Sequence, residues 1–307
     1  MYRRHGDGKL IVSATDLVGF LECGHLTELE RAAARGLVPR PNRKDPEVEL
    51  LRRRGFEHEL RYIREKLAGK RITSLPDKDD AGEDLPLETR AAQTVEAMQR
   101  GDEVIFQATF FDGKWRGHAD FLLREPAPKE ESAASLSTFA RSGEPDVTTE
   151  PDVITRRDSE PASGVRRQTG LGADWIYEIA DTKLARSAKA SALIQICSYV
   201  DQIEQVQGVN PVCVYVVTGG GEIEVHPFRT AEMMAYYRHA KARFEAAIDD
   251  EISGAPTYPI DRQASYPDPV EHCAVCRWYP DYCRVQWRDD DALKLVAGIT
   301  RAQRQEL

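Results

Sequence analysis

The sequence predicts an α/β (α+β) fold in which helices flank a mixed central β-sheet and further helical parts lie at both ends of the chain. Up to residue 100, apolar residues recur at helical spacing. Beyond residue 103 they gather in short runs rich in β-branched and aromatic residues, which is typical of strands. The length of 307 residues suits one large domain or two ordinary ones.

The first predicted helix covers residues 13–35. Ser13 or Thr15 can cap its N-terminus, because their hydroxyl groups accept hydrogen bonds from the first turn. Gly36 is suited to end it, since glycine readily takes the left-handed backbone found after helices. Cys23 is expected inside this helix.

Two more helices are expected before the sheet. Residues 45–69 follow a helical pattern in which Gly55 is an interruption. His58 lies in the same pattern, behind several basic residues. Residues 86–100 form the third predicted helix.

The strands begin after this third helix. The segments 103–111 and 114–124 read as two strands, and the Asp112-Gly113 pair between them is a hairpin signal. A third strand is expected at 175–185. The remaining elements are a helix at 188–206, strands at 211–219 and 222–228, and a long helix at 230–252.

Residues 125–174 are rich in Pro, Ser, Glu and Arg and have little apolar periodicity, so we expect a disordered insertion there. The predicted units are an N-terminal helical region at 1–100 that carries Cys23 and His58, a core at 101–252 that contains the insertion, a cysteine-rich segment at 253–290, and a last segment at 291–307.

Composition sets broad limits on location and partners. No stretch approaches the apolar length of a membrane span, and the first residues lack the apolar run of a secretory signal. We therefore expect a cytoplasmic protein without a membrane partner, whose cysteines stay reduced. The formal net charge of −9 argues mildly against nucleic acid as a partner, although local basic patches can coexist with it.

Three polar residues of the predicted strands are suited to metal chemistry. Asp181 and Lys183 are two apart in one strand and therefore face the same side, and the adjacent strand can bring Asp120 beside them. Two carboxylates at one point favour a cation between them, and oxygen ligands suit Mg²⁺ or Mn²⁺. Taken alone, Asp181 and Lys183 would more simply form an ion pair on a solvated strand.

The order of further residues points to a known family. Gly55 to His58 follow the pattern G-x-x-H, Gly117 to Asp120 follow G-x-x-D, Asp181 to Lys183 follow D-x-K, and Gln195 to Tyr199 follow Q-x-x-x-Y on one helix face. The order and element types resemble the RecB-like branch of the PD-(D/E)XK nuclease superfamily. The resemblance implies a restriction-endonuclease-like core.

The resemblance also implies roles for six residues. It makes His58, Asp120 and Asp181 the ligands of Mg²⁺ or Mn²⁺, and Lys183 catalytic together with the two aspartates. Gln195 and Tyr199 would support the site or the strand. Glu57 and Glu59 flank His58 and could replace it as ligands, because both have carboxylate side chains.

Four of the six cysteines form a second pattern: Cys23 near the start, then Cys273, Cys276 and Cys283 in HCAVCRWYPDYC. Such a set fits a [4Fe–4S] cluster and also fits structural zinc, for which His25 and His272 are alternative ligands. RecB-like nucleases of the exonuclease V-like and CRISPR-adaptation types have one cysteine before the core and three after it. That resemblance favours the cluster as a structural clamp between the two ends. Cys197 and Cys213 are expected in the core.

The last segment, LKLVAGITRAQRQEL, resembles the start of a helix-hairpin-helix found in a bacterial group of RecB-like nucleases that continue into further domains. We therefore expect the chain to be truncated, with further C-terminal domains or a protein partner; the sequence leaves the oligomeric state open.

Three functions remain to be compared. The first is a metal-dependent deoxyribonuclease acting on single-stranded DNA or DNA ends. The second is a non-catalytic nucleic-acid-binding or scaffolding module with the same fold and cysteine site, and the third is a small-molecule hydrolase. Basic side chains that could contact phosphate, or equally form a solvated helix face, are Arg52, Arg53, Arg54, Arg61 and Lys189.

Overall fold

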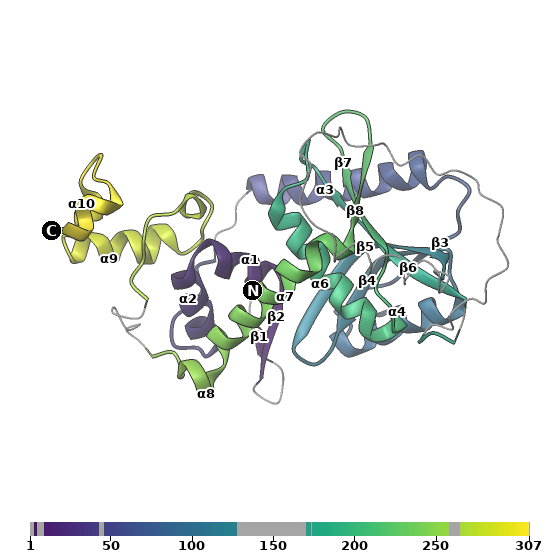
Figure 1. Ribbon diagram of the computed structural model, residues 1–307, viewed down its shortest axis with the longest axis horizontal. Helices are drawn as coiled ribbons and strands as arrows, with labels where there is room; N and C mark the ends of the chain where they lie inside the picture. Colours follow the sequence, from purple (N-terminus) through teal and green to yellow (C-terminus); the bar gives the residue numbers. More distant parts are fainter. Residues whose placement is uncertain are drawn as a thin grey trace, which may run out of the picture.

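A computed structural model describes residues 3–4, 9–42, 46–127, 170–172, 174–257 and 265–306 (Figure 1). It has a mixed sheet with helices on both faces, so the α+β prediction is confirmed at that level. Most of the predicted insertion, residues 128–169, lies outside the described residues.

The sheet has eight strands in the order β1-β2-β5-β6-β7-β8, with β4 on the other edge of β5 and β3 beside β4. Antiparallel and parallel pairs alternate along the order from β1 to β8; on its other edge β5 runs antiparallel to β4, and β3 and β4 are parallel. The strands are β1 (Arg3–Arg4), β2 (Leu10–Ser13), β3 (Ile72–Ser74), β4 (Val104–Phe111), β5 (Trp115–Pro126), β6 (Trp175–Lys183), β7 (Cys213–Thr218) and β8 (Glu224–Arg229).

The sheet forks along β5. One edge of β5 pairs with β4, while the other pairs with β2 at Trp115 and Arg116 and with β6 from Phe121 onward. Residues 117–120 lie between these two partners. Opposite them on β4, the pairing skips Gln107, whose φ of 61° interrupts the regular strand.

Helices cover both faces of the sheet (Figure 1). On one face α3 packs Tyr62 against Phe106 and Phe121 of the sheet. On the other, α4, α6 and α7 share the main core, in which Val200 and Phe244 are fully buried. The main helices are α1 (Ala14–Glu22), α2 (Gly24–Ala34), α3 (Pro46–Lys66), α4 (Leu87–Arg100), α6 (Ala190–Gln207) and α7 (Thr230–Ile248).

The expected single helix at 13–35 is two helices, so the prediction that Cys23 lies within a helix is wrong. Cys23 has an extended backbone (φ −159°, ψ 110°) and separates α1 from α2. The predicted ends are confirmed. Ser13 precedes α1 and donates from its N–H and hydroxyl to Asp16 Oδ2, and Gly36 follows α2 with φ 73°.

The cysteine-rich segment packs against α2, so a segment from the last part of the chain lies beside one from the first part (Figure 1). Trp278 is fully buried against Leu29 and Ala32, and its indole N–H donates to Glu30 Oε1 at 2.8 Å. The elements here are short: α8 (Asp250–Ser253), η1 (Glu271–Ala274), η2 (Tyr279–Cys283), α9 (Arg284–Asp289), η3 (Leu293–Leu295) and α10 (Arg301–Glu306).

Other differences from the sequence predictions are local. Gly55 does not interrupt α3, which is continuous because a single glycine costs a helix only about 1 kcal/mol. The strands β2 and β3 lie in the region that was expected to be helical, and both pair with the core sheet. Residues 125–126 belong to β5 rather than to the insertion. None of the helices described has the length and apolar character needed to cross a membrane.

Candidate functional site

Asp120 lies at the fork of the sheet. Pairing between β5 and β6 ends at Phe121 and Ala180, and beyond that point the Asp120 side chain replaces a backbone partner. Its Oδ2 accepts hydrogen bonds from the Thr182 backbone N–H (2.7 Å) and hydroxyl (2.8 Å). Among the described residues no donor contacts Oδ1, so this oxygen is available to a ligand.

Asp181 and Lys183 lie on the same side of β6, as their spacing predicts, and their side chains form an ion pair. Asp181 is only 1% exposed. Burial raises the pKa of its carboxyl group well above the usual range; the nearby charge of Asp120 raises this pKa further, and the Lys183 ammonium opposes both effects. Asp120 and Asp181 therefore lie close enough to repel each other, with one cation beside them.

A third carboxylate approaches from α3. Glu59 Oε2 accepts a hydrogen bond from Gln107 Nε2 at 2.6 Å, and Gln107 stands opposite Asp120 in the sheet. Burial raises the pKa of Glu59 to about 7, and the charges of Asp120 and Asp181 contribute to the rise. The docking of α3 on the sheet thus gives the site a third acidic group.

His58 is directed toward β7. Its ring is buried, with Nε2 3.3 Å from the Val217 carbonyl oxygen, and it fills the space that a side chain at Gly219 would need. Within the described residues, no hydrogen bond or ion pair joins His58 to Asp120 or Asp181. His58 on α3 therefore lies against β7 beside the site, and the side chain that α3 brings to the two aspartates is Glu59.

Gln195 and Tyr199 form a pair on α6, as their spacing of four predicts. Gln195 Nε2 donates to the Tyr199 hydroxyl oxygen at 2.6 Å. Tyr199 is buried beside Gly117, where an added Cβ would lie only 2.9 Å from the tyrosine ring. Burial raises the Tyr199 pKa, and the charges of Asp181 and Asp120 add to this rise. Gly117 thus lets α6 approach β5 next to the carboxylates.

The four patterned cysteines meet at the other end of the molecule. Cys23, Cys273, Cys276 and Cys283 line one cavity between α2 and the cysteine-rich segment, and none of them is in a disulfide. Burial raises the pKa of the Cys23 and Cys276 thiols, and it raises that of Cys283 to about 12, with the neighbouring thiols adding to the effect.

The break between α1 and α2 at Cys23 places this thiol beside the three other cysteines, which lie about 250 residues later in the sequence. His272 lines the same cavity, whereas His25 Nδ1 is hydrogen-bonded to Ser265 Oγ at 2.9 Å. Cys197 is buried in the main core as expected, and Cys213 is half-buried on β7.

Both sets of side chains fit the groups that the sequence suggests. The buried Asp181 carboxylate, the available Oδ1 of Asp120 and the Glu59 carboxylate are oxygen donors suited to Mg²⁺ or Mn²⁺. Four reduced thiols around one cavity suit iron–sulfur or zinc. As they stand, no three His, Cys, Asp or Glu side chains in the described ranges are close enough to enclose an ion.

Sequence reasoning missed two residues of the site, Gln107 and Thr182. Thr182 stands between Asp181 and Lys183, so the D-x-K pattern treats it as a spacer, although it binds Asp120 through two groups. Gln107 can be recognised as a site residue only when α3 is placed on the sheet, because its partner Glu59 lies on that helix. The sequence pattern offers Glu59 only as a replacement for His58.

Comparisons with known proteins add no relative to this picture. No family model matches the sequence, and a search of curated proteins finds no match. Function is therefore inferred from the side chains and their geometry.

Proposed function

We propose that this protein is a Mg²⁺- or Mn²⁺-dependent nuclease that hydrolyses DNA phosphodiester bonds, acting on single strands or strand ends. The observation that carries this proposal is the meeting of Asp120, Asp181 and Lys183 where β5 and β6 part. A buried carboxylate beside a second one is costly without a cation. Carboxylates held in such an unfavourable arrangement are typical of functional sites, where the arrangement serves the chemistry rather than stability.

A divalent ion, when bound, lowers the pKa of a water and offsets charge on the phosphate. Asp181, Asp120 and Glu59 would hold it. The Lys183 ammonium, fixed by Asp181, donates a hydrogen bond to the attacking water or to a phosphate oxygen. The water oxygen forms a new bond to phosphorus, one ester P–O bond breaks, and the water proton passes to solvent or to the leaving oxygen.

We further propose that Cys23, Cys273, Cys276 and Cys283 hold a structural [4Fe–4S] cluster, with zinc as the alternative. Their placement between α2 and the last helices supports a clamp between the two ends of the chain. Anaerobically purified protein should absorb near ~400 nm and contain iron. A colourless, zinc-loaded sample would refute the iron–sulfur assignment and leave the nuclease proposal intact.

The nuclease proposal is tested by Mn²⁺-dependent cleavage of an end-labelled single-stranded oligonucleotide. We expect Lys183→Ala to lower the cleavage rate by about a hundredfold or more, because a positioned charge at the reacting phosphate is lost. Lys70→Ala, in the exposed turn after α3, is the matched control. Equal cleavage by wild type and Lys183→Ala, or none by either, would favour the non-catalytic nucleic-acid-binding or scaffolding module.

A further inference from the structure

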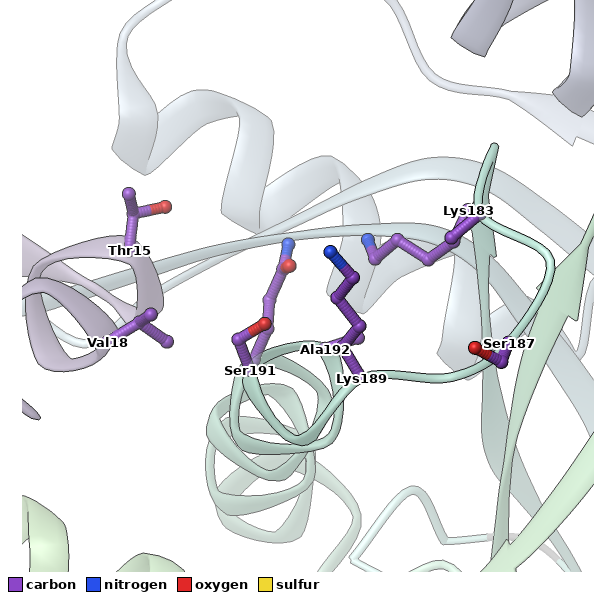
Figure 2. Close-up of a pocket in the computed structure, with 9 residues that line it drawn as sticks. Thr15, Val18, Lys183, Ser187, Lys189, Ser191 and Ala192 are labelled. Carbon is purple, nitrogen blue, oxygen red and sulfur yellow. The ribbon is translucent and has the colours of Figure 1, made fainter. Parts of the chain in front are cut away.

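A surface pocket adjoins the carboxylates on the α6 side. It lies between the first turn of α1 and the segment that joins β6 to α6, and its volume is about 250 Å³ (Figure 2). Polar residues that line it are Thr15, Lys183, Ser187, Lys189, Ser191 and Gln195. The shared residue Lys183 makes this pocket continuous with the candidate site.

The pocket carries two positive charges, one of which has no carboxylate partner within the described ranges. Figure 2 shows the ammonium ends of Lys183 and Lys189 pointing into the same space, with Thr15 on the helix across from them. Lys183 is paired with Asp181, but Lys189 has no carboxylate partner among the described residues. No Asp or Glu is found among the described residues that line the pocket.

The start of α6 adds to this charge. Lys189 is the N-cap residue of this 18-residue helix, whose first turn contains no acidic side chain. The backbone N–H groups of Ala190 and Ser191 precede the first intrahelical bond, which runs from Ala192 N–H to the Lys189 carbonyl. The N-terminus of a helix attracts anions through such N–H groups and through its dipole.

Other basic residues on the candidate phosphate-binding list lack these features. Arg61 is held by Glu65 and by the Gly221 carbonyl oxygen. Arg52 is largely exposed and lies 3.8 Å from Glu49. Of the five residues on that list, Lys189 is the one that lines the pocket beside the carboxylates, and in the part of the chain that the structure describes no carboxylate pairs with it.

We propose that this pocket holds the phosphodiester next to the scissile one, with Lys189, the Ser191 hydroxyl and the α6 N-terminus binding its oxygens. The inference rests on the proposed nuclease function and adds a positioning residue to it. A second pocket shares Thr15 and Val18 with the first and continues toward Cys276 and Arg277. Asp16 and Glu30 line this second pocket together with Arg277, so it is mixed in charge and the phosphate contact is assigned to the first pocket alone.

The first test measures binding without cleavage. A labelled single-stranded oligonucleotide is titrated with the full chain in EDTA at several salt concentrations, using fluorescence anisotropy. We expect Lys189→Ala to weaken binding about tenfold, as for a lost charged hydrogen bond. The slope of log K against log salt should fall in magnitude by about 0.7, the value for one phosphate contact on a single strand. Lys189→Arg should restore most of the affinity, and Lys70→Ala should match wild type.

The second test separates positioning from general damage. With Mn²⁺, Lys189→Ala should raise KM for the oligonucleotide while changing kcat less. It should affect bis(p-nitrophenyl) phosphate much less, since that ester has no neighbouring phosphate. Circular dichroism melting checks that the variant folds.

Unchanged salt slope and affinity in Lys189→Ala would overturn the proposal. So would a protein that binds inorganic phosphate, detected by competition, while its oligonucleotide affinity is independent of Lys189. If Lys189→Ala weakens oligonucleotide binding in EDTA but the wild-type protein cleaves no DNA, the phosphate site is supported and only the nuclease function is refuted.

Discussion

Glu59→Gln should stabilise the metal-free protein at alkaline pH and leave its stability nearly unchanged at acidic pH. The Glu59 carboxyl group has a pKa raised from 4.5 to about 7 by burial and by Asp120 and Asp181. Below pH 4.5 it is neutral in both the folded and unfolded states. Between pH 4.5 and about 7 the unfolded chain has released this proton while the folded protein still holds it, so stability falls with rising pH until the folded carboxyl group also ionises.

The magnitude follows from the size of the pKa shift. A rise from 4.5 to about 7 corresponds to about 3 kcal/mol, since each unit is worth about 1.4 kcal/mol. The side chain is part exposed, and solvent screening reduces this to about 1.5 kcal/mol. Glutamine carries no charge and can still accept the hydrogen bond from Gln107, so the substitution removes the cost without losing the contact.

Urea unfolding in EDTA near pH 4 and near pH 8.5 measures the effect, with midpoints and slopes fitted for both proteins. Glu57→Gln, at the exposed neighbouring position on α3, is the control and should shift stability equally at the two pH values. If the free energy of unfolding differs between Glu59→Gln and wild type by the same amount at both pH values, the electrostatic reasoning is refuted.

Three further outcomes are expected. Asp181→Asn should abolish Mn²⁺-dependent cleavage and the rise in melting temperature on adding Mn²⁺; a wild-type rise that persists in the variant would place the ion elsewhere. Cys273→Ser should lose most of the bound iron or zinc and the visible absorbance, whereas Cys213→Ser should keep them, as metal analysis will show. Gly219→Ala should destabilise the protein by about 2 kcal/mol through overlap with the His58 ring, and clearly less in a His58→Ala background, as a double-mutant cycle of unfolding free energies can establish. Equal costs in both backgrounds would contradict the packing seen here.

The parts of the site that local geometry controls could be predicted from the sequence. Asp181 and Lys183 share a side because strands alternate every two residues, and Gln195 meets Tyr199 because helices repeat about every four. The hairpin at Asp112 and Gly113 was likewise a local signal. These contacts depend on few neighbours, so the pattern was enough.

The parts that depend on docking could not be predicted. Glu59 joins the site only because α3 packs across the sheet. Gln107 reaches Glu59 because its own backbone has a positive φ, which no residue pattern predicts. The break at Cys23 separates two helices whose sequences carry one continuous helical pattern. Strands as short as β2 and β3 have too few residues for their period to be recognised.

The hydrogen bond between Trp278 and Glu30 has a consequence for how the protein is made. It joins residues 248 positions apart, and the indole covers the apolar side of α2. A ribosome must therefore synthesise the 248 residues that follow Glu30 before that side is shielded from water, and contacts of such wide separation form slowly. Until then this side of α2 stays open to proteases and chaperones, which limited proteolysis of stalled nascent chains would detect.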